Sequence, residues 1–596
     1  MDIPLRRSIA ENLHFDTAIQ AISTKEEQTA AKKEFETASD ADSLGFIYKS
    51  GEVSILTIGL NSLTWDLDGK LRDAAAVQSE DGMVWAIEAD ESGREVYSLK
   101  CYNKRGVVWH NETSIGPFLC VKNGVCYVVE CTSELRYGRC VSLDAKTGGE
   151  RRLLFTEPSR RNNLSLLRGE GGCVFLQSDN SGTKALYVID GVSVKRIGEE
   201  CVSFVPVGYD ESGAVCFFGR IGNLSAPWTP FGIQHNIPLA VRRDGIDLFS
   251  SRHAILITSS GGVRRIYRCG YDSVPKKLDE IVGQIGYDIY SLWEGKDTVR
   301  LVYKEAGKTP SVYDISSKGM KRIKAGVEYA KHTVLTCRSK DGTAVPYILV
   351  QKGKARRGLM IVIYGAYGLP TGLGTSRWKP YLDAGWGIVF GLIRGGGDFG
   401  DEWAAAARTY KKWKSVEDTI AVILAAQKRT GISWERTCIY GRSAGGYTLG
   451  AIVAHHGTGG IVGAAYAEVP YVDVLRTTST PSLPLTILEY DEFGNPRKNP
   501  RDLKTIRELS PVDALPSEGA PGVFVVARTS MNDREVLPYE SVKWVDRLRG
   551  KSFYGEEKYL AITDGHGHFV SGSTGNEQKA QDFILLDSWL TSRGRV

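Results

Sequence analysis

The chain lacks long apolar runs, paired cysteine motifs and any large net charge. None of its hydrophobic stretches reaches the roughly 20 residues of a membrane-spanning helix, and residues 1–8 contain no apolar segment of the kind that directs secretion. The 11 cysteines are odd in number and include no C-x-x-C pair, which argues against a disulfide framework and against a zinc site. We therefore expect a cytoplasmic protein with reduced thiols, no membrane partner, no metal and no cofactor.

The net charge of the chain also gives no indication of an acidic partner. The 75 basic and 70 acidic side chains give a net charge of only +5, and no long basic run is present, so a nucleic-acid partner is not indicated. Hydrophobic residues make up 42% of the chain and charged residues 24%, as in ordinary globular proteins. A length of 596 residues exceeds what one core supports, so two or more domains are expected.

The first part of the chain changes texture near residue 45. Residues 15–40 are rich in Ala, Glu, Lys and Gln, which predicts one long or two short helices. From there to about residue 325, short runs of Val, Ile, Tyr, Phe and Cys, such as Val125–Val128 and Val215–Phe218, alternate with turn residues. The period of roughly 40–48 residues is typical of four-stranded propeller blades. About six units can be counted and seven would fit the length; a pair of sandwiched sheets is the alternative.

After residue 325 the pattern becomes β/α. A hairpin is expected within 333–350, strands at 359–364, 387–393, 463–468, 522–527 and 558–562, and helices at 416–428, 540–548 and 576–590. Strands that alternate with helices predict a doubly wound, mostly parallel sheet. Functional groups of such sheets lie on loops at the carboxyl ends of the strands.

One serine stands where this architecture places a nucleophile. The apolar run Cys438–Tyr440 is followed by Gly441-Arg-Ser443-Ala-Gly445 and by a mostly apolar helix over 447–456. This is the strand–turn–helix context of a G-x-S-x-G nucleophile elbow. The N–H of Ala444 then points to where an oxyanion develops. An ordinary turn before a helix is the alternative unless a base and an acid follow downstream.

The histidine base should follow the last strand, because the order along the chain in this fold is serine, acid, histidine. Only His566 and His568 lie beyond the helix after Ser443, and both are in the loop after the strand 558–562. We predict His566, between two glycines, as the base. His568 is interpreted as a neighbour or a surface residue.

The acid should follow the strand 522–527, and Asp533 is the predicted residue. Asp564 competes but lies only two residues from His566, a poor separation for reaching its Nδ1 atom. A helix N-cap is the alternative role for Asp533. A second oxyanion donor is expected after the strand 359–364, where the hydroxyls of Tyr364 and Tyr367 are both candidates.

Seven spaced motifs then carry a resemblance to a known family. They are Arg338-Ser-Lys-Asp-Gly-Thr-Ala-Val-Pro346, Tyr364-Gly-Ala-Tyr-Gly368, Arg394-Gly-Gly-Gly-Asp-Phe-Gly400, Gly441-Arg-Ser-Ala-Gly-Gly446, Val469-Pro-Tyr-Val-Asp-Val474, the stretch 483–496, and Asn532-Asp533 with Gly565-His566-Gly567. With them, roughly residues 330–596 resemble the prolyl oligopeptidase family of serine peptidases, most closely its oligopeptidase B branch.

The resemblance implies a β-propeller that caps an α/β-hydrolase domain, with an active site between them that admits short peptides and excludes folded proteins. It implies the triad Ser443, Asp533 and His566, and it favours Tyr364 as the oxyanion tyrosine.

The resemblance also divides the chain. The boundaries that we predict are an N-terminal helical segment at 1–45 that packs on the hydrolase domain, a propeller at 46–325 and the peptidase domain at 326–596.

Substrate preference is predicted from acidic residues. The oligopeptidase B branch holds a basic P1 side chain with acids before a Gly-Asn-Pro turn, and this chain has Glu489 and Asp491 there, with Glu492 beside them. Paired carboxylates suit an arginine or lysine head group; a solvated acidic loop is the alternative. Residues 371–375 lack the acids that favour a second basic residue, and Glu535 replaces the arginine of the prolyl-specific enzymes, so neither dibasic nor strict post-proline cleavage is expected.

The sequence thus predicts a serine oligopeptidase that cleaves short peptides after Arg or Lys through an acyl-enzyme, as a monomer or a homodimer. Alternatives are an esterase, acyl hydrolase or peptide cyclase of the same fold, a prolyl-type oligopeptidase, and a scaffold protein that retains the fold.

Overall fold

The computed structural model describes residues 5–42 and, between short gaps, residues 46–593. Within 38–75 and 197–300 it describes the backbone of the strands but not the side chains. The side chain of Cys216 and residue Gly522, each expected to belong to a strand, therefore lie outside the described residues.

An eight-stranded sheet forms the centre of the C-terminal part, with the strand order β28-β29-β31-β30-β32-β33-β34-β35. The hairpin β28–β29 is antiparallel to its neighbours, and the strands from β31 to β35 are parallel. The mostly parallel sheet predicted from the β/α pattern is thus confirmed. The strands are β28 (Lys331–Arg338), β29 (Ala344–Gln351), β30 (Leu359–Ile363), β31 (Gly387–Gly391), β32 (Thr437–Arg442), β33 (Ala464–Glu468), β34 (Phe524–Ser530) and β35 (Lys558–Thr563).

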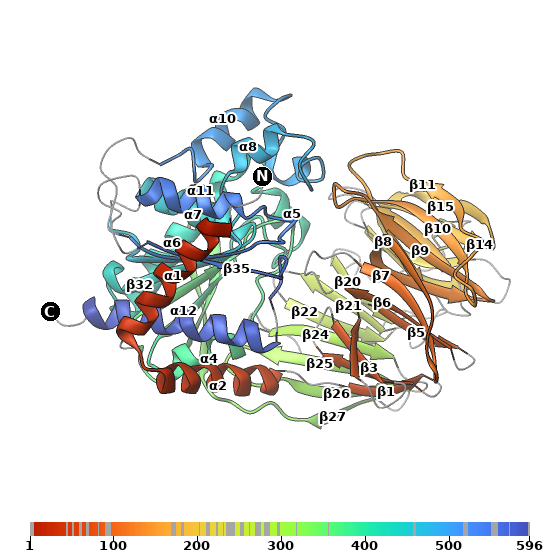
Figure 1. Ribbon diagram of the computed structural model, residues 1–596, viewed down its shortest axis with the longest axis horizontal. Helices are drawn as coiled ribbons and strands as arrows, with labels where there is room; N and C mark the ends of the chain where they lie inside the picture. The colour runs from red at the N-terminus through yellow and green to blue at the C-terminus, as the bar shows by residue number, and fades with distance from the viewer. Residues whose placement is uncertain are drawn as a thin grey trace.

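Helices cover both faces of this sheet (Figure 1). All five residues of β30 are buried, as expected for a parallel strand between two helical layers. One face packs on α6 (Trp413–Thr430), α7 (Gly445–His456), α10 (Pro500–Leu509) and α11 (Tyr539–Arg549), and the other on α4 (Thr375–Asp383) and α12 (Gly572–Arg593). Three shorter helices, α5 (Asp401–Ala405), α8 (Val474–Ser479) and α9 (Tyr490–Phe493), lie in the connections.

Two N-terminal helices, α1 (Leu5–Ile22) and α2 (Lys25–Asp42), add to the second face. They are separate because Thr24 and Glu27 form a reciprocal capping box, in which the Thr24 N–H donates to the Glu27 carboxylate at 2.7 Å and the Glu27 N–H donates to the Thr24 hydroxyl at 3.2 Å. Asn12 of α1 binds to the edge strand β35, because its side-chain amide forms hydrogen bonds with both the N–H and the C=O of Ile562.

Before residue 325, the part of the chain that the structure describes forms six antiparallel sheets, which lie together beside the α/β part in Figure 1. Five have four strands and one has seven. In the seven-stranded sheet, β8 pairs with β7 through residues 106–115 and with β9 through residues 115–122. This sheet is therefore two four-stranded units that share one long strand.

The strands of these sheets follow the chain in order. They are β1 (Phe46–Ser50), β2 (Val53–Ile58), β3 (Ser62–Asp66), β4 (Leu71–Ala74), β5 (Ala76–Glu80), β6 (Met83–Ala89), β7 (Tyr97–Asn103), β8 (Gly106–Lys122), β9 (Val125–Cys131), β10 (Tyr137–Asp144), β11 (Arg152–Thr156), β12 (Asn163–Arg168), β13 (Val174–Asp179), β14 (Lys184–Asp190), β15 (Ser193–Cys201), β16 (Ser203–Tyr209), β17 (Val215–Ile221), β18 (Leu224–Thr229), β19 (Gly232–Ile233), β20 (Gly245–Ser250), β21 (Ile255–Ser260), β22 (Val263–Arg268), β23 (Lys276–Leu278), β24 (Tyr287–Glu294), β25 (Thr298–Glu305), β26 (Ser311–Ser316) and β27 (Gly319–Lys324).

Direct contacts join the two parts of the molecule. The Leu485 N–H donates to the Glu134 carbonyl at 3.2 Å, and the Arg534 guanidinium donates to the Ser133 carbonyl at 3.2 Å. Within the described residues, no helix has both the length and the apolar character needed to cross a membrane.

Candidate active site

Ser443 occupies a strained turn between β32 and α7. Its φ angle is +51°, a left-handed conformation that is uncommon for a residue with a side chain and that is held by the surrounding structure. The Ser443 N–H donates to the Glu468 carbonyl at 2.9 Å, and the Ser443 carbonyl accepts from the Gly446 N–H at 2.8 Å and the Tyr471 N–H at 2.9 Å. The strand–turn–helix prediction is confirmed, and the serine is held at the carboxyl end of a central strand.

The glycines of the elbow are required by close packing. A Cβ atom on Gly441 would lie 2.5 Å from the Gly445 carbonyl oxygen, and one on Gly446 would lie 2.4 Å from the Pro470 Cβ atom. Any side chain there would push the helix away from the strand and from the neighbouring loop.

Asp533 pairs with His568. Asp533 follows β34 and His568 follows β35, which are adjacent parallel strands, so both residues lie at the same edge of the sheet. The His568 Nδ1 atom lies 2.8 Å from Asp533 Oδ2, and both side chains are buried. The other carboxylate oxygen accepts the N–H groups of Glu535 and Val536, each at 2.9 Å. Asp533 therefore both orients an imidazole and caps the turn that follows it.

The structure differs here from the sequence prediction, which assigned the base to His566. The carbonyl of His566 accepts the Asn532 N–H at 3.1 Å, and its half-buried side chain forms no hydrogen bond with the described residues. Gly565 has a φ angle of +69°, and after this turn the loop directs His568 inward, where it is 3% exposed. With one glycine between the two histidines, sequence spacing could not distinguish them, and the apolar Phe569 after His568 is itself exposed.

The environment of His568 shifts its pKa upward. Burial alone would lower the pKa, but the hydrogen bond and negative charge of Asp533, with a contribution from Glu535, outweigh it. The Glu535 carboxylate lies 3.7 Å from His568 Nε2, and Arg442 donates to the His568 carbonyl at 2.5 Å. His568 is thus held both at its imidazole ring and at its backbone carbonyl.

The two oxyanion candidates have different partners. Tyr367, at a φ angle of +58°, donates its hydroxyl to Glu489 Oε2 at 2.7 Å. Tyr364 lies directly against the elbow, because a Cβ atom on Gly445 would be 3.5 Å from its Cα atom. Burial raises the pKa of Tyr364, so its hydroxyl keeps its proton at neutral pH and is a competent donor. Ala444 is buried directly after the serine.

The three acids predicted for substrate binding have three different environments. Buried Glu492 pairs with Lys412 at 2.6 Å and with Arg408 at 3.3 Å. Asp491 forms an ion pair with Arg161, which lies between β11 and β12. The remaining acid is Glu489, whose side-chain carboxylate accepts only the Tyr367 hydroxyl among the described residues.

Glu489 is therefore a carboxyl group without a cation of its own. Burial, together with the nearby Glu492 and Glu535 carboxylates, raises its pKa to about 8, against the opposing effects of the Tyr367 hydrogen bond and of Lys412. A cation placed beside Glu489 would restore its ionised form.

The described residues include no group of three or more side chains suited to hold a metal ion. The chemistry available at this edge of the sheet is that of a serine hydroxyl, a buried acid–histidine pair and a tyrosine hydroxyl. These are the elements of an α/β-hydrolase-type nucleophilic site.

Comparison with known proteins shows a family likeness in the C-terminal part of the chain. Residues 375–593 match the model of the prolyl oligopeptidase family. A prolyl endopeptidase-like protein of Gallus gallus is 31% identical over 222 residues, 36% of this chain and 30% of the relative. Protease 2 of Moraxella lacunata is 30% identical over 248 residues, 40% of this chain and 35% of the relative. The matches thus span about a third of the length of these curated relatives.

The fold is shared over nearly the whole chain. Oligopeptidase B from Leishmania major superimposes with a TM-score of 0.82 at 18% sequence identity, covering 98% of this chain and 92% of that one. The likeness in fold therefore extends across the β-rich part.

Proposed function

We propose that this protein is a serine oligopeptidase that cleaves short peptides after Arg or Lys. The observation that carries the proposal is the buried Asp533–His568 pair, at the same sheet edge as the strained Ser443. Glu489 supports the basic preference, because its carboxyl group has no cation among the described residues and has a raised pKa.

In the first step, His568 Nε2 takes the proton of the Ser443 hydroxyl while Ser443 Oγ attacks the scissile carbonyl carbon. Asp533 accepts the Nδ1–H and stabilises the imidazolium that forms. The Tyr364 hydroxyl and the Ala444 N–H stabilise the oxyanion of the tetrahedral intermediate. His568 then donates the proton to the leaving amine, the C–N bond breaks, and an acyl-enzyme remains.

In the second step, His568 activates a water molecule that attacks the acyl carbon, and the proton passes back to Ser443 Oγ as the carboxylic acid leaves. His566 is the alternative base from the sequence prediction. We favour His568 because it is the histidine bonded to Asp533.

We propose that Glu489 receives the P1 guanidinium or ammonium group. Asp491 and Glu492 already hold cations of the protein, so they support the pocket by shape and by charge rather than as free ligands. Glu535, two residues after Asp533, adds negative charge where a prolyl-specific enzyme would carry arginine, which disfavours a prolyl-type preference.

We further propose that residues 46–325 form a seven-bladed propeller that restricts access to the site. Five of the seven units are the four-stranded sheets. The other two are the halves of the seven-stranded sheet, which have β8 in common. Residues 1–45 would then belong structurally to the peptidase domain at 326–596, as the bonds of Asn12 to β35 suggest.

Steady-state cleavage of fluorogenic peptides with P1 Arg, Lys, Pro, Phe or Ala tests the proposal. We expect the highest kcat/KM for Arg or Lys and no turnover by Ser443→Ala. Negligible turnover of every peptide, with Ser443 still labelled by a fluorophosphonate, would instead favour an esterase or acyl transferase. In that case, product partitioning with added amines would show whether an acceptor other than water takes the acyl group.

A further inference from the structure

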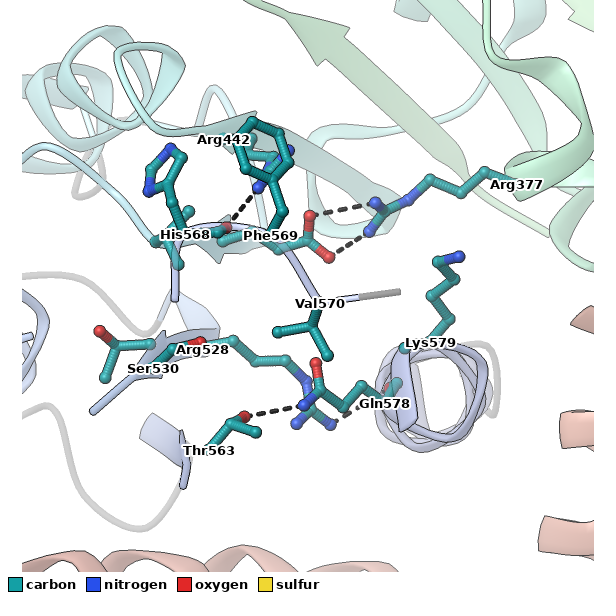
Figure 2. Close-up of a pocket in the computed structure, with 14 residues that line it drawn as sticks. Arg377, Arg442, Arg528, Ser530, Thr563, His568, Phe569, Val570, Gln578 and Lys579 are labelled. Carbon is teal, nitrogen blue, oxygen red and sulfur yellow. Dashed lines mark hydrogen bonds and ion pairs between the residues drawn. The ribbon is translucent and has the colours of Figure 1, made fainter. Parts of the chain in front are cut away.

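A cavity lies behind the loop that carries His568. It has a volume of about 200 Å³ and is bounded by the ends of β33, β34 and β35 and by the start of α12. His568 is itself one of the lining residues, and Figure 2 shows its ring beside that of Phe569, with the ring centroids 5.2 Å apart. The cavity therefore adjoins the loop of His568 directly.

The walls of this cavity are rich in cations. Arg377, Arg442, Arg528 and Lys579 line it, with Glu468 as the acidic residue among the lining side chains. Two of the four cations are neutralised locally. Arg377 forms a two-point ion pair with Glu468, and Arg528 pairs with buried Asp582 at 2.7 Å.

Lys579 has no such partner. Its ammonium group donates to the Asn576 side-chain oxygen at 3.3 Å, and it forms no ion pair within the described part of the chain. Burial, with the positive charges of Arg377 and Arg442, lowers its pKa to about 8, against the opposing effect of the Glu468 carboxylate. A partly buried cation that has only a neutral acceptor is stabilised when an anion binds beside it.

Arg442 connects the cavity to the catalytic loop. Its guanidinium donates one N–H to the His568 carbonyl at 2.5 Å and lies over the Phe569 ring at 4.3 Å. A planar guanidinium has five N–H donors, so donors remain for a ligand after the bond to His568.

We propose that this cavity binds a small oxyanion, a carboxylate or a phosphate group, between Lys579 and Arg442. Both anions match the fork of an arginine together with the point charge of a lysine. Two sources offer this chemistry: a free phosphate ion, or the carboxylate of a peptide bound at the neighbouring site. Because Arg442 holds the His568 carbonyl, an anion at this place would also stabilise the loop of the catalytic histidine.

Titration calorimetry with sodium phosphate and with sodium acetate tests the proposal. It is performed on the Ser443→Ala protein, so that the result does not depend on turnover or on the proposed peptidase activity. We expect saturable binding of at least one anion. Lys579→Gln should weaken it by about ten- to hundredfold, since bonds to charged groups contribute ~1.5–3 kcal/mol, and Lys579→Arg should retain it. Lys504→Gln, at an exposed lysine of α10, is the matched control and should bind like the parent.

The source of the anion is distinguished by a pair of fluorogenic peptides that end in a free carboxylate or in an amide. A lower KM for the free acid that disappears in Lys579→Gln assigns the site to the substrate; phosphate binding without this difference assigns it to the free ion. The proposal is overturned if neither anion binds at millimolar concentration and the two peptides behave alike, or if Lys579→Gln binds as tightly as Lys504→Gln.

Discussion

Two neighbouring histidines have different environments, and the chemistry depends on which one meets the acid. His568 is buried against Asp533 with a 2.8 Å bond, while His566 contributes its backbone carbonyl to the Asn532 N–H. The difference arises from the turn at Gly565, a long-range consequence of how the loops after β34 and β35 meet. Local sequence contains no information on which side of that turn faces the acid.

Glu489 provides a pH-dependent test of substrate preference. The raised pKa of about 8 means that this carboxyl is protonated in the free enzyme at neutral pH and ionises as the pH rises. Because this pKa is about 8, the ratio of kcat/KM for a P1 Arg peptide to that for a P1 Ala peptide should rise between about pH 7 and pH 9 and level off only above about pH 9. Because the ionisation of His568 affects both substrates, its contribution cancels in the ratio of the two kcat/KM values.

Glu489→Gln should remove this pH dependence and lower kcat/KM for the Arg peptide by about ten- to hundredfold, the usual effect of losing a hydrogen bond to a charged group. Asp564→Asn, at an exposed acid of the histidine loop, is the control and should leave the ratio unchanged. A flat ratio in the parent enzyme, or an unchanged ratio in Glu489→Gln, would place the P1 side chain elsewhere.

At the scale of elements, the elbow depends on close contact between β32, α7 and the loop after β33. Gly446→Ala would place a methyl group 2.4 Å from the Pro470 Cβ atom, and overpacking of this kind costs about 1–3 kcal/mol. We expect a lower midpoint of thermal unfolding and reduced fluorophosphonate labelling of Ser443.

Gly372→Ala is the matched control for this substitution, since nothing lies within 4 Å of a Cβ atom there. It should unfold at the parent temperature. Equal thermal stability of Gly446→Ala and Gly372→Ala would show that the elbow is not under the steric constraint inferred here.

The elements around Ser443 could be predicted because their signals are local. The apolar run 438–440, the glycines and the helix 447–456 are contiguous in sequence, and the structure places β32 and α7 there. The same holds for α6, expected at 416–428 and found at Trp413–Thr430, where Gly431 in a left-handed conformation ends the helix.

The roles of the acids could not be predicted in the same way. Glu489, Asp491 and Glu492 are nearly adjacent in sequence, but their partners Tyr367, Arg161 and Lys412 come from three distant segments. These contacts decide which of the three carboxyl groups has no cation of the protein as its partner and can bind a ligand. The resemblance to a family places the acids near the site and leaves their individual roles open.

At the scale of the whole molecule, side-chain and backbone contacts join the β-rich part to the α/β part. Arg161 pairs with Asp491, next to the proposed P1 pocket. Because Arg161 is largely exposed, with 53% of its side chain accessible, this pair contributes at most ~1 kcal/mol. Arg161→Gln should therefore cleave a tripeptide at a rate within about threefold of the parent. The ratio of 30-residue peptide cleavage to tripeptide cleavage should increase by up to about fivefold over the parent ratio.

Arg152→Gln is the control for this prediction, since Arg152 pairs with Glu150 within the same β-rich part. It should not change the ratio of long to short peptide cleavage. A ratio in Arg161→Gln equal to that in Arg152→Gln would mean that this contact does not restrict access.

The central claim is that Ser443 is activated by the histidine bonded to Asp533. The most direct measurement is kcat/KM for a fluorogenic P1 Arg peptide with His568→Ala and His566→Ala, each checked for folding by circular dichroism. We predict that His568→Ala loses about 10⁴-fold or more, as expected for removal of a catalytic base, and that His566→Ala stays within about threefold of the parent. The reverse result, with His566→Ala inactive and His568→Ala active, would contradict the account.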